Sequence, residues 1–548
     1  MEQGNEEKKG LSRRAFLGLS ATVAAGAAVA GLAGCSPSSG ASTSSTSTSS
    51  SASSKVADTT TVALNSSIDK GTASFEITAD SKKADDTKSV DVVVVGSGLG
   101  GFAAALTAAE QGASSVVMLE KNSSLGGSTN FAECPAGARP FEYTEAEARA
   151  AAAESQTTSQ GVIDPMLLYC MCRDAKENFD WLFTTHGVGW TKQGQAPAFY
   201  EGGNGAICIQ KLTKAAEGMS QVTIEKSTPA TQLLVSDDYT VTGVRAKTAD
   251  GKYVDYTAKA VVLATGGMST NKTLLANYSS QDLEKTIGWG QGQDGDGQLM
   301  AEQTAHGRAN HLTVDSLFNN VQGFSYDSAL GACVGMQPSV FWVNQDGLRF
   351  MNESITSTAV SGKVVEEQGE VWSILDTDAV AKYAAGGCSR HYSGFADPLV
   401  GNPITGLNDE ITKYLSSCPT ECFKATTISE LAKDIDVDAT VLQKEIDAYN
   451  TGTDAEWGKD AANMWPIKTA PFYAFRISSG MLNTSGGIRI NTNAQVVDAR
   501  GKVISGLYAA GVCTSGWDGE VYGNGTCQAN ALWCGRTAAK YIAKNVLK

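Results

Sequence analysis

Short apolar runs alternate with glycine-rich turns from Asp91 onwards. The run from Asp91 to Val95 is rich in β-branched residues, which predicts a strand buried on both faces of a parallel sheet. Glycines follow at once in Gly96-Ser97-Gly98-Leu99-Gly100-Gly101, and the alanine-rich stretch after them predicts a helix. A second apolar run, Ser115 to Leu119, ends in Glu120. We therefore predict an α/β fold that opens with a Rossmann-like strand, turn, helix and strand.

The glycine turn has the spacing of a dinucleotide-binding loop. Gly96 permits a tight turn, Gly98 lets the backbone approach a pyrophosphate, and Gly101 lets the helix pack closely. The start of the helix, next to Ser97, would present unpaired N–H groups to the phosphates. Glu120 stands at a strand end, where an acidic residue can bond ribose hydroxyls. The absence of an arginine beside it argues against a ribose phosphate.

Length and composition limit the remaining possibilities. A chain of 548 residues is long enough for two domains and a leader. Its net charge of -15 argues against a nucleic-acid partner bound through a basic face. The twelve cysteines include no Cys-x-x-Cys-His haem motif. Cys170 with Cys172, and Cys418 with Cys422, do not match a four-cysteine spacing, so ordinary thiols are favoured over an iron–sulfur cluster and no metal site is predicted.

The N-terminal residues have the pattern of an export signal. Ser12-Arg13-Arg14-Ala15-Phe16-Leu17 precedes an apolar stretch, Leu19 to Ala33, that is too short and too weakly hydrophobic to be a convincing transmembrane anchor. The arginine pair followed by Phe-Leu resembles a twin-arginine signal, which exports proteins folded with their cofactor. Leu32-Ala33-Gly34-Cys35 resembles a lipobox, with a simple cleavage site and an incidental cysteine as the alternative.

The segment after this signal is predicted to be a tether. Residues 36–54 are rich in Ser, Ala, Thr and Gly, a composition typical of flexible linkers. We expect a twin-arginine and lipoprotein signal over 1–35 and a linker over 36–88. The expected location is the cell envelope, where a lipidated Cys35 would hold the protein at a membrane surface.

Several later motifs point to one family when they are taken together. They are Gly126-Gly127-Ser128-Thr129, Ala260 to Gly267, Asp294-Gly295-Asp296-Gly297, Thr484-Ser485-Gly486-Gly487 and Gly506 to Gly511. With the first glycine turn, they resemble the flavoprotein family of fumarate reductases, succinate dehydrogenases and 3-ketosteroid 1-dehydrogenases. The resemblance runs from about Asp91 to the C-terminus, and its motifs are specific in combination.

The resemblance implies a cofactor and a domain plan. The cofactor would be FAD in a Rossmann-like domain that is split in sequence into 89–310 and 472–548. An α+β capping domain, 311–471, would be inserted between the two parts, with substrate at the domain interface. FAD should be noncovalent, because members that tether it use a histidine and the segment 126–137 contains none. The resemblance assigns FAD to Gly96, Ser97, Gly98, Gly101, Glu120, Lys121, Gly127, Ser128, Thr129, Ala264, Thr265, Gly266, Asp296, Gly486, Gly511, Asn530 and Leu532.

The capping domain departs from the pattern of the fumarate reductases. The family signature Gly-x-Arg-Phe-x-Asn-Glu appears as Gly347 to Glu353 and fixes the register. Four residues later, where those enzymes have a proton-donating arginine, this chain has Ser357. The arginine and glutamate of the family's proton relay fall at Met336 and Cys333, and a substrate-binding histidine falls near Asn320.

The C-terminal part departs from that pattern as well. A second substrate histidine becomes Asn483, and the arginine that clamps a substrate carboxylate becomes Tyr522. A dianion buried without cationic partners would suffer a desolvation penalty of several kcal/mol per charge. We therefore do not expect fumarate or succinate to be the substrate.

Tyr522 suggests a different substrate. The segment Val521-Tyr522-Gly523-Asn524-Gly525 is similar to one in the steroid dehydrogenases, where the tyrosine hydroxyl and a glycine N–H polarise a ketone. We predict hydride transfer between flavin N5 and the β-carbon of a C=C bond conjugated to a ketone or lactone, whose oxygen Tyr522 would bind. Glu520 would either handle a proton or only hold the turn.

The capping domain should supply a second group that handles the proton. Tyr326 is one candidate, although a structural tyrosine is the commoner role. Arg390-His391-Tyr392 is another, and a solvated polar turn explains it equally well. Of the four histidines, at 186, 306, 311 and 391, His186 is assigned no role.

Direction depends on the electron partner. We prefer reduction of a small-molecule acceptor, with electrons from a separate membrane or cytochrome donor. The twin-arginine lipoprotein arrangement is similar to that of anaerobic respiratory reductases of this family, and the cardiac-glycoside (digoxin) reductases look like a close analogue. The alternatives are a 3-ketosteroid dehydrogenase, a fumarate-like reductase of a small unsaturated acid, and a nonenzymatic electron-relay flavoprotein. The long inserted segment argues against the last.

Overall fold

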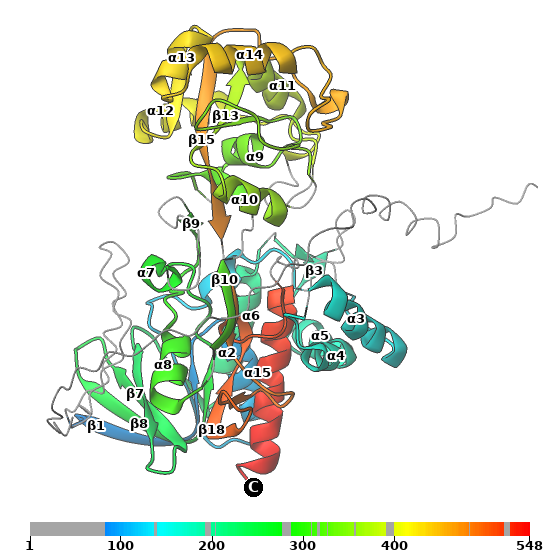
Figure 1. The fold of residues 1–548 in the computed structure, drawn as a ribbon. Helices are drawn as coiled ribbons and strands as arrows, with labels where there is room; N and C mark the ends of the chain where they lie inside the picture. The colour runs from blue at the N-terminus through cyan, green and yellow to red at the C-terminus, as the bar shows by residue number, and fades with distance from the viewer. Residues whose placement is uncertain are drawn as a thin grey trace, which may run out of the picture. The chain divides into compact units, whose positions relative to one another are not determined.

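The computed structural model describes residues 83–548 except for 136–139, 160, 192–198, 203, 277–285, 308, 315–317, 326, 356–357, 391–398, 482 and 520–525. The predicted α/β class is confirmed: one mostly parallel sheet has helices beside it, and a second sheet with its own helices follows in the chain (Figure 1). The two sheets have separate hydrophobic cores.

An eight-stranded sheet contains the predicted opening unit. Strand β1 pairs in parallel with β2 and β8, β2 pairs in parallel with β5, and β8 pairs in parallel with β18. Antiparallel pairs join β6 to β7, β7 to β8, and β17 to β18. The strands are β1 (Asp86–Val95), β2 (Val116–Leu119), β5 (Val222–Glu225), β6 (Ala230–Val235), β7 (Val241–Lys247), β8 (Tyr253–Leu263), β17 (Gln495–Val497) and β18 (Val503–Ala509).

Strand β1 is longer than its apolar run predicts. Val92 to Val95 are buried between β2 and β8, as a central parallel strand requires. The preceding residues, from Asp86, pair with β8 alone. They extend the ladder at its exposed end, where polar side chains are compatible with strand pairing but leave no apolar pattern in the sequence.

Helices pack against this sheet and against one another. The first, α2, begins at Leu99 directly after the glycine turn, and the last, α15, packs against it. A Cβ atom on Gly535 of α15 would lie 2.3 Å from the carbonyl oxygen of Gly100, so these helices approach more closely than a side chain would permit. The helices are α2 (Leu99–Glu110), α3 (Glu145–Thr158), α4 (Pro165–Arg173), α5 (Ala175–Asp180), α6 (Ala206–Glu217), α7 (Lys272–Leu275), α8 (Asp296–Ala305) and α15 (Thr526–Asn545).

The second sheet is formed by segments before, within and after the predicted capping region. Its longest strand, β15, pairs with β9, β11, β13 and β14, and β13 pairs with β12. The strands are β9 (Ile287–Gly288), β11 (Phe318–Val321), β12 (Phe341–Asn344), β13 (Val371–Asp376), β14 (Cys422–Ala425) and β15 (Phe472–Met481). Strand β15 thus belongs to this sheet, although the expected boundary stands immediately before it.

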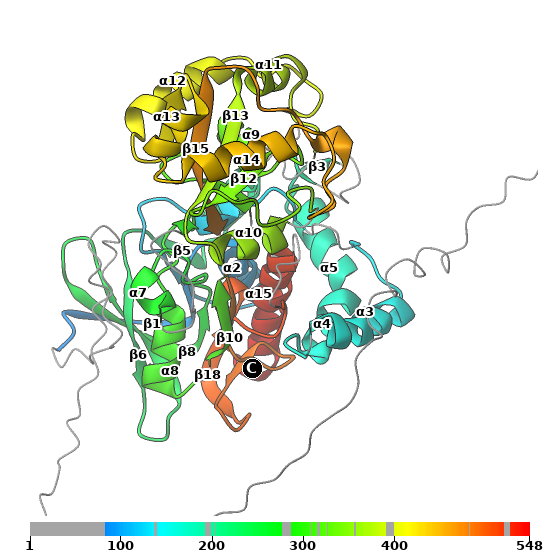
Figure 2. The ribbon, with the colours of Figure 1, turned by 45° about the horizontal axis from the view of Figure 1, so that its top comes forward.

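Helices pack on both faces of the second sheet (Figure 2). The side chain of Asp376 caps the start of α11, and that of Thr427 caps the start of α13. Each accepts a hydrogen bond from a backbone N–H group that has no partner within the helix. The helices are α9 (Ala329–Gly335), α10 (Thr358–Glu366), α11 (Thr377–Gly386), α12 (Leu407–Ser417), α13 (Ile428–Asp434) and α14 (Ala439–Tyr449).

Two short ribbons complete the described strands. They pair β10 (Ala309–Val314) with β16 (Thr484–Ile488), and β3 (Trp190–Thr191) with β4 (Phe199–Tyr200). Strand β16 contains the predicted flavin motif and follows Asn483. It therefore brings the C-terminal cofactor motif beside the segment that leaves α8.

Candidate functional site

Two glycines of the first turn are required by the protein itself. A Cβ on Gly96, whose φ is +103°, would lie 2.3 Å from the carbonyl oxygen of Ala264. A Cβ on Gly101 would lie 2.0 Å from the carbonyl oxygen of Gly96. Gly98 is different, because its nearest contacts would be Thr129 Oγ1 at 3.6 Å and a carbonyl oxygen at 3.8 Å. The protein leaves space at Gly98, where a dinucleotide-binding turn must admit phosphate.

Glu120 organises this turn from inside the protein. Its buried carboxylate accepts hydrogen bonds from Ser97, from the N–H at 3.1 Å and the hydroxyl at 2.6 Å. Its other oxygen accepts the Asn122 N–H at 2.8 Å. Ser97 Oγ in turn accepts the N–H of Gly126 at 3.0 Å. Glu120 and Ser97 therefore tie the first glycine turn to the second, and the bond to ribose stays a prediction.

The second glycine segment is held by its own side chains. Gly127 has a φ of +48° and is the first residue of the short 3₁₀ helix Gly127–Phe131. Thr129 Oγ1 accepts the Leu99 N–H at 3.1 Å, and Ser128 Oγ accepts the amide of Gln293 at 2.6 Å. Both hydroxyls, predicted as cofactor ligands, thus fix the backbone of the segment.

Lys121 joins two distant motifs through buried charge. Its ammonium group lies 2.6 Å from Asp294 and 2.7 Å from Asp296, and all three side chains are largely buried. Burial alone would lower the pKa of Lys121, but the two carboxylates raise it overall. The structure therefore brings together Lys121 and Asp296, which the family resemblance assigned to FAD binding from separate motifs.

Gln293 was missed by the sequence reasoning. Besides its bond to Ser128, its amide oxygen accepts the hydroxyl of Ser269 at 3.1 Å, and its backbone carbonyl accepts the hydroxyl of Thr270 at 2.8 Å. It thereby bridges the segment after β2 and the segment after β8. Its only sequence signal was its place directly before Asp294-Gly295-Asp296-Gly297.

Three further predicted FAD residues, Gly266, Gly486 and Gly511, lie after β8, in β16 and after β18. Gly266 and Gly486 have φ values of +77°, and Gly511 has +79°. The hydroxyl of Thr484 accepts the Met268 N–H at 3.2 Å, which joins the turn after β8 to β16. Asn530 donates to the carbonyl oxygen of Gly511 at 3.2 Å. The turn at Gly511 is thus held beside the start of α15.

Three other residues predicted to bind FAD lie at the end of β8, beside α8 and in the core. Ala264 continues β8 by donating its N–H to Val95, at 2.8 Å. A Cβ on Gly297 would lie 2.3 Å from the hydroxyl of Thr265, so this threonine faces the first turn of α8. Leu532 is buried in the core.

These residues fit a dinucleotide. The turn is open at Gly98, and the helix α2 begins one residue later. Among the described residues, neither Asp296 Oδ1 nor Gln298 Oε1 has a hydrogen-bond partner, although both are buried. Buried acceptors of this kind are satisfied by hydroxyl donors, which a ribose or ribityl chain provides in number.

The positions that correspond to the proton relay are uncharged and buried. Cys333 and Met336 lie in the apolar core of the second sheet. The amide oxygen of Asn320 accepts the N–H of Val321 at 2.8 Å, so this side chain turns back on its own strand. The structure therefore places no relay charge at Cys333 or Met336.

Asn483 is placed differently. It is 5% exposed, and its Nδ2 has no hydrogen-bond partner among the described residues. An amide nitrogen can only donate, so it seeks an acceptor oxygen. The neighbouring Ser485 donates to the carbonyl oxygen of Gly519 at 3.1 Å, which ties this strand to the residue before 520–525.

Several predicted residues lie outside the described part of the chain. They are the three catalytic candidates Tyr522, Glu520 and Tyr326, together with Ser357, His391, Tyr392 and the signal residues up to Cys35. Their roles stay predictions.

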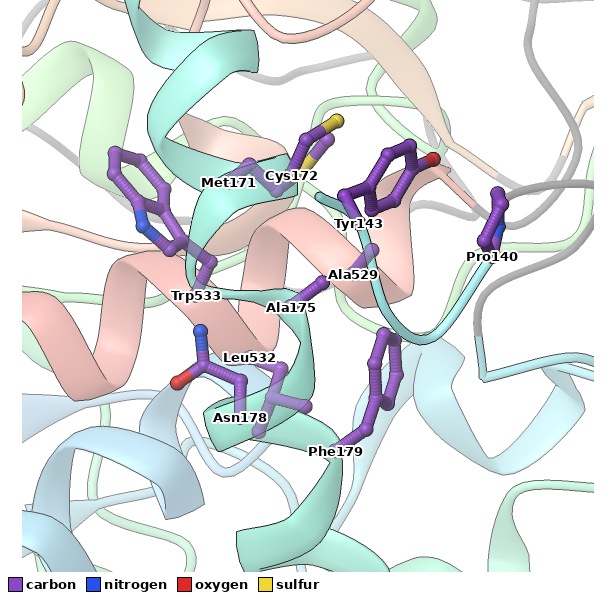
Figure 3. Close-up of a pocket in the computed structure, with 10 residues that line it drawn as sticks. All are labelled: Pro140, Tyr143, Met171, Cys172, Ala175, Asn178, Phe179, Ala529, Leu532 and Trp533. Carbon is purple, nitrogen blue, oxygen red and sulfur yellow. The ribbon is translucent and has the colours of Figure 1, made fainter. Parts of the chain in front are cut away.

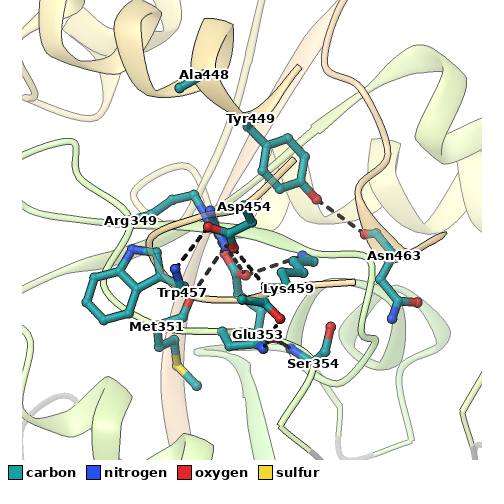
Figure 4. Close-up of polar contacts among 12 residues, drawn as sticks. Arg349, Met351, Glu353, Ser354, Ala448, Tyr449, Asp454, Trp457, Lys459 and Asn463 are labelled. Atoms are coloured by element: carbon teal, nitrogen blue, oxygen red, sulfur yellow. Dashed lines mark hydrogen bonds and ion pairs between the residues drawn. The ribbon is translucent and has the colours of Figure 1, made fainter. Parts of the chain in front are cut away.

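The family signature of the capping region forms a buried charge network (Figure 4). Arg349 donates to Glu353 at 2.8 and 3.0 Å and to Asp454 at 3.0 Å. Lys459 lies 3.3 Å from Glu353, and burial lowers its pKa to about 8. Two cations and two carboxylates balance, so this motif fixes the loop rather than binding substrate charge.

A separate, mostly apolar hollow lies beside α15 (Figure 3). Tyr143, Phe179, Leu532 and Trp533 are among the residues that line it. Within the described residues, no group of three or more His, Cys, Asp or Glu side chains could hold a metal ion. In the same part of the chain, no helix is both long and apolar enough to cross a membrane.

The chain belongs to the FAD binding domain family, whose pattern it matches over residues 91–527. This confirms the family predicted from the glycine motifs and FAD as the cofactor. The protein is therefore an FAD-dependent oxidoreductase, in the class of reductases that act on carbon–carbon double bonds.

Characterised relatives define that class. The chain is 30% identical over 483 residues to the vinyl phenol reductase of Lactiplantibacillus plantarum, covering 83% of this chain and 97% of the relative. It is 31% identical over 452 residues to the urocanate reductase of Eggerthella lenta, covering 78% and 70% respectively. It is 28% identical over 519 residues to the digoxin reductase of the same organism, covering 83% and 87%.

Solved structures share the fold. A flavocytochrome c3 fumarate reductase in its open conformation superposes with a TM-score of 0.65 at 24% identity, covering 85% of this chain and 80% of that one. The 3-ketosteroid Δ1-dehydrogenase of Sterolibacterium denitrificans gives 0.67 at 20% identity, covering 83% and 100%. These likenesses concern architecture.

Proposed function

We propose that the protein is an exported, FAD-dependent reductase of an activated C=C bond in a neutral acceptor, an α,β-unsaturated ketone or lactone. The acceptor would be steroid-like or another small organic molecule. FAD would be held noncovalently by the glycine turns and by the network around Lys121 and Gln293. When bound, FAD supplies the hydride from N5.

One observation supports a neutral substrate above all others. At four described positions where fumarate reductases have relay or substrate-binding charges, this chain has Asn320, Cys333, Met336 and Asn483, and all four side chains are buried. A buried dicarboxylate needs cationic partners to offset its desolvation. An uncharged carbonyl needs only hydrogen-bond donors, and Asn483 Nδ2 is a buried donor without an acceptor among the described residues.

Tyr522 completes the proposed substrate site. Its hydroxyl would donate to the conjugated oxygen and stabilise the enolate that develops as the β-carbon receives hydride. Asn483 would donate to the same end of the substrate. The α-carbon would then receive a proton, which Glu520 or a capping-domain residue such as Tyr326 would deliver.

The relatives support a substrate of this class. Two of them reduce molecules without a carboxylate, vinyl phenol and digoxin, as their names state. Of the others named above, two act on acids, urocanate and fumarate, and one acts on a 3-ketosteroid. The buried, uncharged positions in this chain favour the first group.

The location and the electron donor are part of the proposal. The twin-arginine signal would export the folded flavoprotein, and lipidated Cys35 would hold it at the envelope membrane. A separate membrane or cytochrome protein would reduce FAD. Changing Arg13-Arg14 to lysines should retain the protein in the cytoplasm, and Cys35→Ala should release it from membranes; membrane attachment of the Cys35→Ala protein would exclude the lipid anchor.

An anaerobic screen tests the substrate class. Photoreduced holoprotein is mixed with neutral enones, unsaturated lactones, 3-ketosteroids, urocanate and fumarate, while flavin reoxidation is followed. We expect fast reoxidation by a neutral acceptor and loss of that rate, by about 100-fold, in Tyr522→Phe. Reoxidation by fumarate alone would establish the dicarboxylate alternative instead. In a parallel mixture with oxidised holoprotein, flavin reduction by a saturated 3-ketosteroid would favour the dehydrogenase direction.

A further inference from the structure

The hydroxyl oxygen of Ser128 has both of its acceptor positions filled. It accepts the side-chain amide of Gln293 at 2.6 Å and the backbone N–H of Gln291 at 3.3 Å. A serine hydroxyl offers two acceptor positions and one O–H donor. The residues that the structure describes provide no acceptor for that O–H. The role left to the hydroxyl of Ser128 is therefore donation to a group from outside the chain.

The neighbouring Thr129 has the same polarity. Its Oγ1 accepts the Leu99 N–H at 3.1 Å, so its O–H is also the part left to donate. This Oγ1 is the atom that a Cβ on Gly98 would meet first, at 3.6 Å. Two adjacent hydroxyls thus offer O–H donors, one of them beside the space at Gly98. Such a pair suits a ligand rich in acceptor oxygens, as a dinucleotide is.

Gln293 is held so that its amide group can act on Ser128. The side chain is 3% exposed, and its Oε1 accepts the hydroxyl of Ser269 at 3.1 Å. A Cβ on Gly267 would lie 2.8 Å from the same Oε1, so the turn after β8 packs directly against the amide. With Oε1 engaged there, Nε2 is directed at Ser128. A buried hydrogen bond meets little competition from water, so this orientation persists.

We propose that Gln293 is a positioning residue of the FAD site, which keeps the hydroxyl of Ser128 turned as a donor toward an acceptor atom of the cofactor. Without the amide, the hydroxyl would be free to rotate and FAD would lose a hydrogen bond. This inference rests on the noncovalent FAD site of the proposed function. It adds a residue that acts on FAD through another residue, and it requires no particular substrate.

A double-mutant cycle tests whether Gln293 acts through Ser128. Dissociation constants come from the rise in flavin fluorescence as holoprotein is diluted. Gln293→Met and Ser128→Ala should each raise the FAD dissociation constant by about tenfold, the effect of one lost hydrogen bond. The double variant should stay within about twofold of Ser128→Ala, because the two changes remove the same contact. Gln443→Met, at an exposed glutamine of α14, is the matched control and should bind FAD as wild type does.

Gln293→Glu tests the direction of the hydrogen bond. A glutamate has nearly the same shape but only accepts, so it would take the proton of Ser128 and still support the segment. The same change in Ser128→Ala protein measures the effect of the added charge alone. The loss of FAD affinity should be at least about tenfold larger when Ser128 is present. Loop support alone would make the two losses equal.

Two further measurements locate the acceptor atom. ADP contains the diphosphate but no flavin, and it is used to displace FAD from wild-type and Ser128→Ala protein. Weaker binding of ADP to the variant assigns the acceptor to a phosphate, whereas a shifted absorption maximum of bound flavin assigns it to the ring. An effect on FAD affinity without either change assigns it to the ribityl chain.

The outcomes are distinguishable. Unchanged FAD affinity in Ser128→Ala overturns the donor role. A loss in Gln293→Met that is equally large in Ser128→Ala protein overturns the positioning role, and so do equal losses for Gln293→Glu in the two backgrounds. If Gln293→Met does not fold, wild-type affinity in Gln293→Glu overturns the proposal. Flavin that stays attached to wild-type protein after denaturation contradicts the noncovalent site of the proposed function itself.

Discussion

The glycine turn of the FAD-binding domain and the signature loop of the capping region, residues 347–355, are both family motifs, yet different physics holds them. At Gly96 and Gly101 an added carbon atom would overlap a backbone oxygen. In the signature loop, Arg349 bonds Glu353 within the loop and Asp454 about a hundred positions away. Steric necessity holds the first motif, and charge balance holds the second. Neither fact by itself identifies the substrate.

Gly101→Ala is the strongest test of whether steric necessity holds the glycine turn. Its Cβ would stand 2.0 Å from a backbone oxygen that cannot move without disrupting the turn. We expect destabilisation by more than about 4 kcal/mol and no flavoprotein on purification. Gly386→Ala, where nothing lies within 4 Å, is the control in thermal unfolding. A Gly101→Ala variant with normal stability and bound FAD would show that the turn is adaptable.

Glu353→Gln tests whether charge balance holds the signature loop. The substitution leaves Arg349 and Lys459 buried against Asp454 alone, so the free energy of unfolding should fall by about 3–5 kcal/mol. Asp250→Asn, which removes an exposed pair with Lys252, should change stability little. Urea unfolding of both variants measures the difference. Equal effects would mean that the buried network does not fix the signature loop.

The buried carboxyl group of Glu366, in α10, should make the stability of the protein depend on pH. Burial raises the pKa of Glu366 to about 7 from its ordinary 4.5, although the hydroxyl of Ser479 and the charge of Lys363 oppose the shift. The unfolded chain loses this proton first, so Glu366 destabilises the fold progressively as pH rises from about 4.5 to 7. Glu366→Gln should therefore gain about 3 kcal/mol more stability at pH 8 than at pH 4.

Unfolding of wild type and Glu366→Gln at both pH values decides this point. Exposed Glu217→Gln, in α6, provides the control. A pH-independent difference between wild type and Glu366→Gln would place the titration of Glu366 near its ordinary range.

The smallest effect should come from Gly98→Ala. Its Cβ would make only ordinary contacts with the protein, at 3.6 Å or more. The apoprotein should keep its melting temperature, while the FAD dissociation constant rises by at least about tenfold because a methyl group enters the phosphate space. Fluorescence titration with FAD measures the affinity. Lost apoprotein stability, or unchanged affinity, would contradict the assignment of that space.

The sequence predicted the glycine framework because its signals are local. The β-branched run, the turn and Glu120 are contiguous or separated by one helix, and their spacing is set by backbone geometry. Strand β15 was harder, since it closes the second sheet by pairing with four strands from distant segments. The links made by Gln293 to Ser128, and by Arg390 to Ser354, depend on side chains that meet only after folding. No short-range pattern records them.

The absence of the fumarate reductases' charged residues could be recognised from the register of the family motifs, but the groups that replace them in the site could not. Asn483 and Gln337 stand out only in the structure, as buried donors without acceptors among the described residues. The comparison of the two motifs thus has a practical lesson. Backbone geometry shared with the family identifies the cofactor, whereas the unsatisfied donor of Asn483 supports the proposed substrate site.

The central claim is that this flavoenzyme reduces a neutral, activated C=C bond. Its most direct test is the ratio of two second-order rate constants for anaerobic reoxidation of the photoreduced holoprotein, one with a neutral unsaturated lactone or enone and one with fumarate. The account predicts a ratio of at least about 100, since fumarate would have to bury two charges without the family's cations. A ratio below one would contradict it.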